Sequence, residues 1–181
     1  MLEGVLGCPV CQAEYPIVDG IVRFAESVLA SSARVADEEE TLRLAATLDL
    51  AGPRGYAVLV GAWGTHAPAL HALTDVQLML VNPPRGLEMG WGLSGVAIQT
   101  DWVTLPLASA SARAIALDDA ATLVQIVAAV DTLAGGGRLL APVSAALPPG
   151  VRELARDERH WVAERSPADS PSRIVGLTRR K

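Results

Sequence analysis

The chain has 181 residues, of which 50% are hydrophobic and 19% charged, and its formal net charge is −5. This composition excludes a disordered chain, which needs low hydrophobicity and high net charge, and its length predicts one core with a short appendage. The acidic balance argues against DNA as a partner, and it makes RNA unexpected too.

Apolar runs in the chain are short and end at glycine, proline or charged residues. None reaches the roughly 18 to 20 residues that a membrane-spanning helix needs. The N-terminus also lacks the basic and apolar regions of a signal peptide. We therefore expect a cytoplasmic protein without a membrane span.

The first part of the chain is expected to form a small β unit over residues 1–26. Two extended segments, 14–18 and 21–24, flank the turn signal Asp19-Gly20. Residues 27–55 are expected to be a linker followed by a helix that begins at the acidic run after Asp37. The buried face of that helix is predicted to carry Leu42, Leu44, Ala45, Leu48 and Leu50.

Residues 56–181 alternate between apolar strands and helices. The predicted strands are 56–60, 76–81, 96–99, 112–117 and 138–141, and the predicted helices are 67–73 and 120–133, the second closed by the glycines at 135–137. Two further segments, 159–165 and 173–178, are expected to pair as a closing hairpin. Strands that are apolar throughout are typical of a parallel sheet covered on both faces. The predicted fold is α/β: a doubly wound, mainly parallel, Rossmann-like sheet with helices on both faces and a closing antiparallel strand, plus the small N-terminal β unit.

Ligands of such sheets bind at the carboxyl ends of the strands, so the turn after residues 56–60 is the first candidate site. Its sequence is Gly61-Ala62-Trp63-Gly64-Thr65. Glycines there allow backbone N–H groups to approach a ligand at a helix start. A plain tight turn is the alternative interpretation.

With these motifs, residues 56–178 resemble a small class I S-adenosylmethionine-dependent methyltransferase domain. The resemblance implies that Gly61, Ala62 and Gly64 hold the methionine part of the cofactor. It implies that Asn82, where the family has an acid, contacts the ribose, that Asp101 contacts the adenine amino group, and that Trp102 stacks on the adenine. Asp118, at the end of the fourth strand, completes the implied cofactor set. The chain departs from the family pattern because the acid before the glycine loop is absent and Trp63 lies where a glycine is expected.

Three other polar residues near the strand ends have two interpretations each. Asp118 and its neighbour Asp119 are expected to be solvated acids before a helix at residue 120, with a substrate-facing role as the alternative. His66 is expected to be a partly exposed surface group, with a role as a base as the alternative. His160 is expected in the closing strand pair, without a role in a site.

Cys8 and Cys11, the two cysteines of the chain, form a single Cys-x-x-Cys motif. A structural zinc site usually needs two such pairs. The motif is therefore a remnant that binds nothing, half of a zinc site completed by another chain, or a redox dithiol. With the following Tyr15-Pro16-Ile17-Val18-Asp19-Gly20-Ile21, it resembles the second knuckle and hairpin of the small zinc-ribbon proteins that activate methyltransferases. This resemblance implies zinc only if two chains share it.

Three functions remain open at this point. The first is a methyltransferase-like protein that has lost catalysis and acts as a binding partner or scaffold, with a protein partner or a homo-oligomer. The second is an active S-adenosylmethionine-dependent methyltransferase acting on a small molecule or RNA. The third is another small-ligand-binding protein of the same fold, since a fold does not fix a function.

Overall fold

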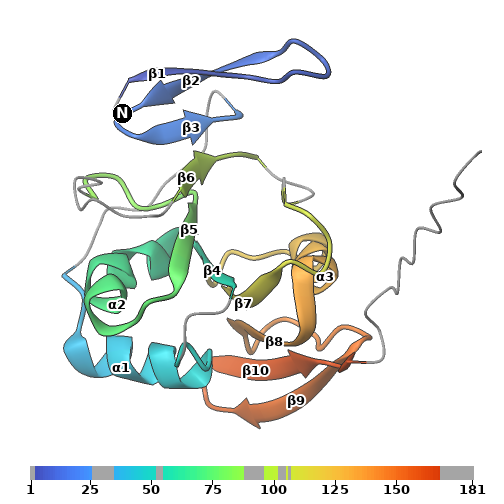
Figure 1. Cartoon of the computed structure of the whole chain (residues 1–181). Helices are drawn as coiled ribbons and strands as arrows, with labels where there is room; N and C mark the ends of the chain where they lie inside the picture. Colours follow the sequence, from blue (N-terminus) through green and yellow to red (C-terminus); the bar gives the residue numbers. More distant parts are fainter. Residues whose placement is uncertain are drawn as a thin grey trace, which may run out of the picture.

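The computed structural model describes residues 3–25, 35–51, 55–87, 96–101, 105 and 107–167. Within these residues, the strands form one ten-stranded sheet in the order β1-β2-β3-β6-β5-β4-β7-β8-β10-β9 (Figure 1). The strands are β1 Gly4–Gly7, β2 Glu14–Val18, β3 Ile21–Arg23, β4 Tyr56–Val60, β5 Gln77–Val81, β6 Val96–Gln99, β7 Ala112–Ala116, β8 Leu133–Pro142, β9 Val151–Arg156 and β10 His160–Arg165.

The central strands are parallel, and they confirm the predicted doubly wound sheet. β4 pairs with β5 on one side and with β7 on the other, and β6 and β8 extend the two halves in parallel. β10 is antiparallel to both β8 and β9, and β9 is the edge strand at this end of the sheet. The helical segments are η1 Gly61–His66, a 3₁₀ helix, and the α-helices α1 Glu38–Thr47, α2 Ala67–Leu73 and α3 Leu123–Thr132.

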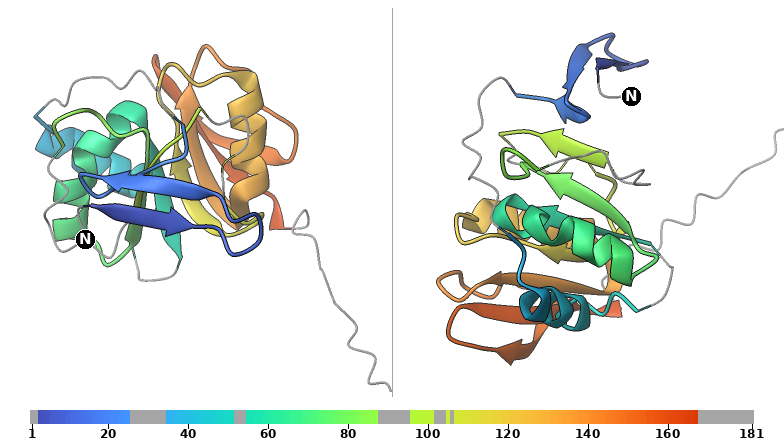
Figure 2. Two further views of the ribbon diagram at one scale, coloured as in Figure 1. Left: turned by 90° about the horizontal axis from the view of Figure 1, so that it is seen from above. Right: turned by 90° about the vertical axis from the view of Figure 1, so that its left-hand side faces the viewer.

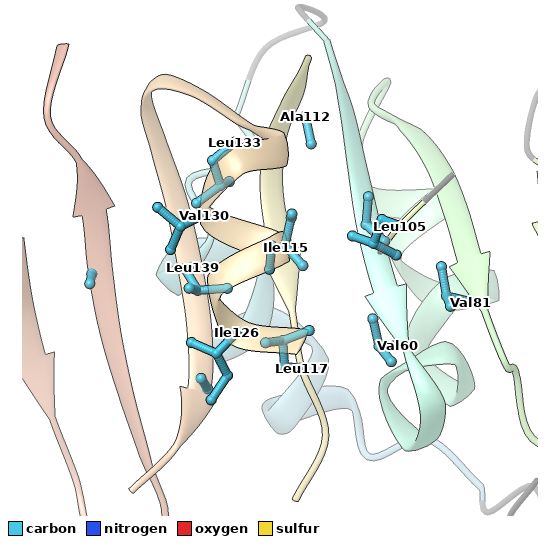
Figure 3. Packing of buried hydrophobic residues seen from close by; sticks show 14 of the residues in the cluster. Val60, Val81, Leu105, Ala112, Ile115, Leu117, Ile126, Val130, Leu133 and Leu139 are labelled. Carbon is cyan, nitrogen blue, oxygen red and sulfur yellow. The ribbon is translucent and has the colours of Figure 1, made fainter. Parts of the chain in front are cut away.

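Helices cover both faces of the sheet. Successive residues of a strand point to opposite faces, so alternate residues of a central strand pack under different helices. α1 and α2 lie on one face and α3 on the other (Figure 2). In β4, Ala57 and Leu59 belong to the core under α1 and α2, whereas Val58 and Val60 belong to the core under α3. Figure 3 shows the second core, in which Ile126 and Val130 of α3 lie over Ile115 and Leu139 of the sheet.

The N-terminal strands continue the central sheet. β3 pairs in parallel with β6, and β2 and β1 follow as antiparallel strands (Figure 1). Tyr15, Ile17 and Phe24 from this end pack against the core under α3. The boundary that we place at residue 26 therefore follows a strand that is hydrogen-bonded to the central sheet.

Helix α1 is fixed at both ends by groups outside its own turns. The Asp37 side chain accepts the N–H of Glu40 at 3.1 Å and caps the start. At the other end Arg138 of β8 donates to the carbonyl of Thr47 at 3.0 Å, and a cation there suits the helix dipole. Of the predicted buried face, Leu44, Leu48 and Leu50 are buried, but Leu42 is 51% exposed. Thr41 takes its place inside.

Two helix predictions need correction. α3 begins at Leu123 and not at residue 120, because Thr122 and Gln125 form a capping box that defines the start. The glycines at 135–137 do not end the helix, which passes directly into β8 at Leu133. Gly137 instead allows a close approach of strands, since a Cβ there would lie 2.8 Å from the carbonyl oxygen of Arg113.

The predicted closing hairpin is also wrong in its pairing. β10 lies between β8 and β9, so its neighbour is residues 151–156 and not 173–178. Residues 173–178 lie outside the described residues, as do Trp102 and most of the expected linker. Among the described residues, no helix is long and apolar enough to cross a membrane.

Candidate functional site

The candidate site lies where the sheet reverses its strand order, at the carboxyl ends of β4 and β7. β4 leads through η1 and α2 to β5 on one side, while β7 pairs with its other edge. In open α/β sheets this is the position at which ligands bind. The predicted residues Gly61, Ala62, Gly64 and Asp118 all come together there.

The carboxylate of Asp118 fills the space above Gly61. Gly61 has φ +58°, and a Cβ added to it would lie 1.6 Å from Oδ2 of Asp118. The carboxylate accepts backbone N–H groups of Ala62 and Ala120, the second at 3.2 Å. Burial raises the pKa of Asp118, with Asp119 adding to the rise and the two N–H groups opposing it. Asp118 is therefore not the solvated helix-start acid that we expect, because it folds back onto the glycine loop.

Asn82, the predicted ribose contact, uses its amide to join two strand ends. Its Nδ2 donates to the carbonyl of Thr100 at 2.9 Å, and its Oδ1 accepts the N–H of Thr100 at 2.8 Å. Asn82 has φ +50°, a left-handed conformation that asparagine tolerates better than most residues. The side chain thus fixes the ends of β5 and β6 together.

Gly64 lies under the two prolines that follow Asn82. A Cβ there would lie 3.1 Å from Cδ of Pro84 and 3.5 Å from Cβ of Pro83. Of the remaining predicted residues, Ala62 and Asp101 are exposed, and Trp102 lies outside the described residues. The structure thus brings Gly61, Ala62, Gly64 and Asp118 to one loop and places Asn82 beside it.

Two adjoining cavities of about 200 and about 150 Å³ open next to this loop. Both are lined by Glu40 from α1, Trp63 from η1, and Arg159 and His160 from the start of β10. The smaller one also reaches His66, Asp118 and Asp119. We call this pair of cavities the switch-point cleft.

His66 lies in the wall of the switch-point cleft and is only 5% exposed, so the expectation of a surface histidine is wrong. The reason is η1, whose turn directs the ring under α1. There Nδ1 lies 2.8 Å from the hydroxyl of Thr41, and Nε2 lies 3.6 Å from Oε2 of Glu40. Burial lowers the pKa of His66, and the charges of Glu40 and Asp37 oppose this effect.

His160 is the second buried histidine of the cleft, 8% exposed and in β10 as expected. Its Nε2 lies 3.4 Å from Oδ1 of Asp119. Trp63 stands between the two histidines, with ring centroids 5.8 Å from His66 and 5.2 Å from His160. Its indole N–H donates to the carbonyl of Leu117 at 3.0 Å, which fixes the ring across the end of β7.

The sequence does not reveal this cluster. Trp63 and His66 are three residues apart in one turn, but His160 is nearly a hundred positions away. The sequence signal that points to it is the position of Trp63 where the resembled family has a glycine. A large ring at that place must find space beyond the loop, and it finds it against His160.

Cys8 and Cys11 lie far from the cleft, in the turn between β1 and β2. Both thiols are free; Cys8 is partly buried and Cys11 exposed. Backbone N–H groups of Cys11 and Val10 lower the pKa of the Cys8 thiol, with a smaller contribution from the Cys11 side chain. Among the described residues, no group of three or more His, Cys, Asp or Glu side chains is placed to hold a metal ion.

Comparison with known proteins gives structural matches only. No protein-family model matches the chain, and no curated protein matches it in sequence. Solved structures similar to it include geranyl diphosphate C-methyltransferase from Streptomyces coelicolor A3(2), at 16% identity over 56% of this chain and 42% of that one, with a TM-score of 0.48. An antibiotic-resistance methyltransferase, Kmr, matches at 15% identity over 77% of this chain and 99% of that one, with a TM-score of 0.45.

A third similar structure is a SAM dependent methyltransferase from Aquifex aeolicus, at 13% identity over 72% of this chain and 98% of that one, with a TM-score of 0.41. The chain spans about half the length of the first solved structures that it matches, 42% to 50% of them. What the chain has in common with these proteins is the Rossmann-like α/β fold, which its own strand order establishes.

Proposed function

We propose that this chain is a methyltransferase-like protein that does not use S-adenosylmethionine and acts by binding a partner. The observation that carries the proposal is the carboxylate of Asp118 on the glycine loop. The methionine part of the cofactor ends in a carboxylate of its own. Two carboxylates at the same N–H groups repel each other, which weakens binding of the cofactor's carboxylate at this loop.

The clamp between Asn82 and Thr100 supports the same conclusion. Both polar atoms of the amide are already bonded to backbone groups. These bonds fix the orientation of the amide, which keeps one N–H and one oxygen lone pair for another partner. A hydrogen bond to a charged group contributes about 1.5 to 3 kcal/mol, and an amide in place of an acid loses that charge.

The packing of Pro84 on Gly64 adds a steric obstacle. The proline ring lies where a Cβ of residue 64 would almost touch it, so the backbone there is already covered. The loop is therefore occupied by an acid at Gly61 and by a proline at Gly64. Contacts within the chain thus replace two implied cofactor contacts, at Gly61 and Gly64, and at Asn82 the charge of the family's acid is absent.

The test is a calorimetric titration of the purified protein with S-adenosylmethionine and with S-adenosylhomocysteine. We expect no binding at millimolar ligand. Asp118→Ala removes the carboxylate from the loop, and Asp119→Ala, in the exposed neighbour, is the matched control. We expect the cofactor affinity of Asp118→Ala to exceed that of the control. Micromolar binding by the unchanged protein, lost in Asp101→Ala, overturns the proposal and favours an active methyltransferase.

The scaffold role itself has a separate support in α3. Leu123, Val124 and Val127 of this helix are 58%, 57% and 45% exposed. Apolar residues grouped on one exposed surface are typical of a contact with another protein.

A second candidate function is small-ligand binding in the switch-point cleft, favoured by Trp63 and the two buried histidines around it. Benzoate and benzylamine, planar probes of opposite charge, test it by saturation-transfer NMR. If the cleft binds such ligands, one probe gives a signal that Trp63→Ala abolishes. Absence of signal from both probes at millimolar concentration contradicts this candidate function.

A further inference from the structure

The ring of His66 presents an acceptor nitrogen to the smaller cavity of the switch-point cleft. Its Nδ1 lies 2.8 Å from the hydroxyl of Thr41, and that hydroxyl already donates to the carbonyl of Asp37. Nδ1 therefore carries the hydrogen, and in the neutral ring Nε2 has a free lone pair. Burial lowers the pKa of His66, which favours the neutral ring at pH 8. Among the described residues, no N–H or O–H group donates to Nε2.

The carboxylate of Glu40 faces the same nitrogen. Its Oε2 lies 3.6 Å from Nε2 of His66, a separation longer than a hydrogen bond. Both atoms are acceptors when the histidine is neutral, so neither satisfies the other. His66 is 5% exposed, and a buried polar group without a partner is unfavourable. Both residues line the smaller cavity, so a ligand there is favoured if it brings N–H groups to the pair.

The rest of the smaller cavity is suited to a positive charge. Asp118 and Asp119 line it together with Glu40. Among the described residues around it, Arg159 supplies the only guanidinium. Thr65 also lines the cavity; it is 9% exposed, and its hydroxyl has no hydrogen-bond partner within the described part of the chain. The cavity therefore offers several oxygen acceptors and an excess of negative charge.

We propose that the smaller cavity binds a primary organic amine in its ammonium form. Two of its N–H groups donate to Nε2 of His66 and to Oε2 of Glu40. Its apolar body lies against Trp63, because a cation is attracted to the face of an indole ring. An ammonium holds two acceptors somewhat farther apart than 3.6 Å, and the side chain of Glu40, 42% exposed, has room to move outward. The inference rests on the second candidate function, ligand binding in the switch-point cleft, and gives it a ligand class.

The same contacts exclude two related classes of ligand. A quaternary ammonium ion carries the charge but no N–H group, so it leaves both acceptors without a donor. An amino acid carries a carboxylate beside its amine, and the acids of the cavity repel that carboxylate. The second exclusion also covers the methionine part of S-adenosylmethionine. An amine site here is therefore compatible with a protein that does not use this cofactor.

The test is an NMR titration at pH 8 with three probes that share an aromatic ring and a benzylic nitrogen. Benzylamine is the expected ligand, benzyltrimethylammonium keeps the charge without an N–H group, and phenylglycine adds a carboxylate. Benzylamine should change the ¹⁵N resonance of His66 Nε2, because this nitrogen gains a hydrogen bond. The other two probes should bind about tenfold more weakly. Equal binding of benzylamine and benzyltrimethylammonium overturns the proposal, because the N–H groups then contribute nothing.

Variants of α1 separate the proposed contact from the general charge of the protein. Glu40→Gln replaces the carboxylate by an amide of the same shape and should weaken benzylamine binding about tenfold. Glu38→Gln, in the same turn of α1, makes the same change of charge outside the cavity and should leave binding unchanged. Circular dichroism checks the fold of both variants. Equal affinities of the two variants for benzylamine overturn the proposal.

Benzoate distinguishes failure of this inference from failure of the candidate function on which it rests. If benzoate binds and benzylamine does not, the cleft is a ligand site for anions and the amine proposal alone is wrong. If neither binds at millimolar concentration, the candidate function and the amine proposal both fail. None of these probes reports on S-adenosylmethionine, so the proposed lack of cofactor binding is decided independently.

Discussion

The hydroxyl of Thr41 lies 2.8 Å from Nδ1 of His66, and this contact joins the first turn of α1 to the loop after β4. The same hydroxyl donates its proton to the carbonyl of Asp37 at 2.8 Å. It therefore accepts from His66, whose Nδ1 carries the hydrogen. In neutral His66 the other nitrogen, Nε2, is then unprotonated and faces Glu40. One hydroxyl thus fixes both the position of α1 and the tautomer of the histidine.

Replacing Thr41 by valine tests the strength of this contact. Valine keeps the shape of the side chain but leaves the Nδ1–H of buried His66 without an acceptor. An unsatisfied buried donor costs about 1 to 3 kcal/mol, so Thr41→Val should lower the free energy of unfolding by about that amount. Urea denaturation measures it. Thr41→Ser retains the hydroxyl and should lose clearly less, and equal losses in the two variants would show that the hydroxyl contributes nothing.

The lowered pKa of His66 predicts a loss of stability in mild acid. The unfolded chain binds a proton at the ordinary histidine pKa, whereas the folded state resists it because the ring is buried. The stabilising contribution of neutral His66 is therefore complete above the ordinary value. It is lost as the pH falls through the lowered pKa. Between about pH 8 and about pH 5 the native protein should lose more stability than His66→Asn, which keeps a donor near the position of Nδ1.

Asp118 changes the stability with pH in the opposite direction to His66, so the experiment needs a control for its contribution. Its folded pKa is raised, so its carboxyl stabilises the fold as the pH falls through the raised value and loses this effect as the pH rises again. The comparison is therefore repeated in an Asp118→Asn background. If His66→Asn has the same pH dependence as its parent in both backgrounds, the assigned role of His66 is wrong.

The start of α1 gives a third prediction. Asp37→Ala removes the side chain that accepts the N–H of Glu40, and loss of such a cap costs about 1 kcal/mol. Asp37→Asn keeps the acceptor but not the charge. Thermal unfolding should rank the three proteins native, Asn variant, Ala variant. Equal losses in the two variants would mean that the effect comes from the charge of Asp37 and not from the cap acceptor.

The sequence predicts the parallel core well because its signal is local. β4 and β6 are found at their predicted bounds, and α2 at its own, since each is an apolar run between clear turn residues. β9 is missed because it is an exposed edge strand rich in charge, without an apolar alternation. The start of α3 is misplaced although its signal, Thr122 followed three residues later by Gln125, stands in the sequence.

The contacts of the candidate site are harder to predict, because they join distant parts of the chain. Asn82 is correctly expected at the end of its strand, but its bond to Thr100 depends on which strands are neighbours. His66 is expected on the surface, because its own helix gives no sign that Thr41 of another helix will cover it. Such pairings follow from the assembled sheet and not from a local pattern.

The contact between Gly61 and Asp118 gives the last prediction, which tests whether the loop is filled by the chain itself. Gly61→Ala should be strongly destabilising, because its Cβ would overlap Oδ2 of Asp118 and because φ is +58°. In Asp118→Ala the overlap with the carboxylate is gone. What remains is a tight contact of 3.3 Å with Cβ of residue 118 and the cost of the left-handed backbone, about 1 to 2 kcal/mol. The two substitutions are therefore coupled, and a double-mutant cycle by urea denaturation should measure an interaction energy of at least about 1 kcal/mol. Asp119→Ala serves as the control partner, since its carboxylate is directed at His160. Additive effects of Gly61→Ala and Asp118→Ala would mean that the carboxylate does not occupy the loop, and the argument against cofactor binding would lose its main support.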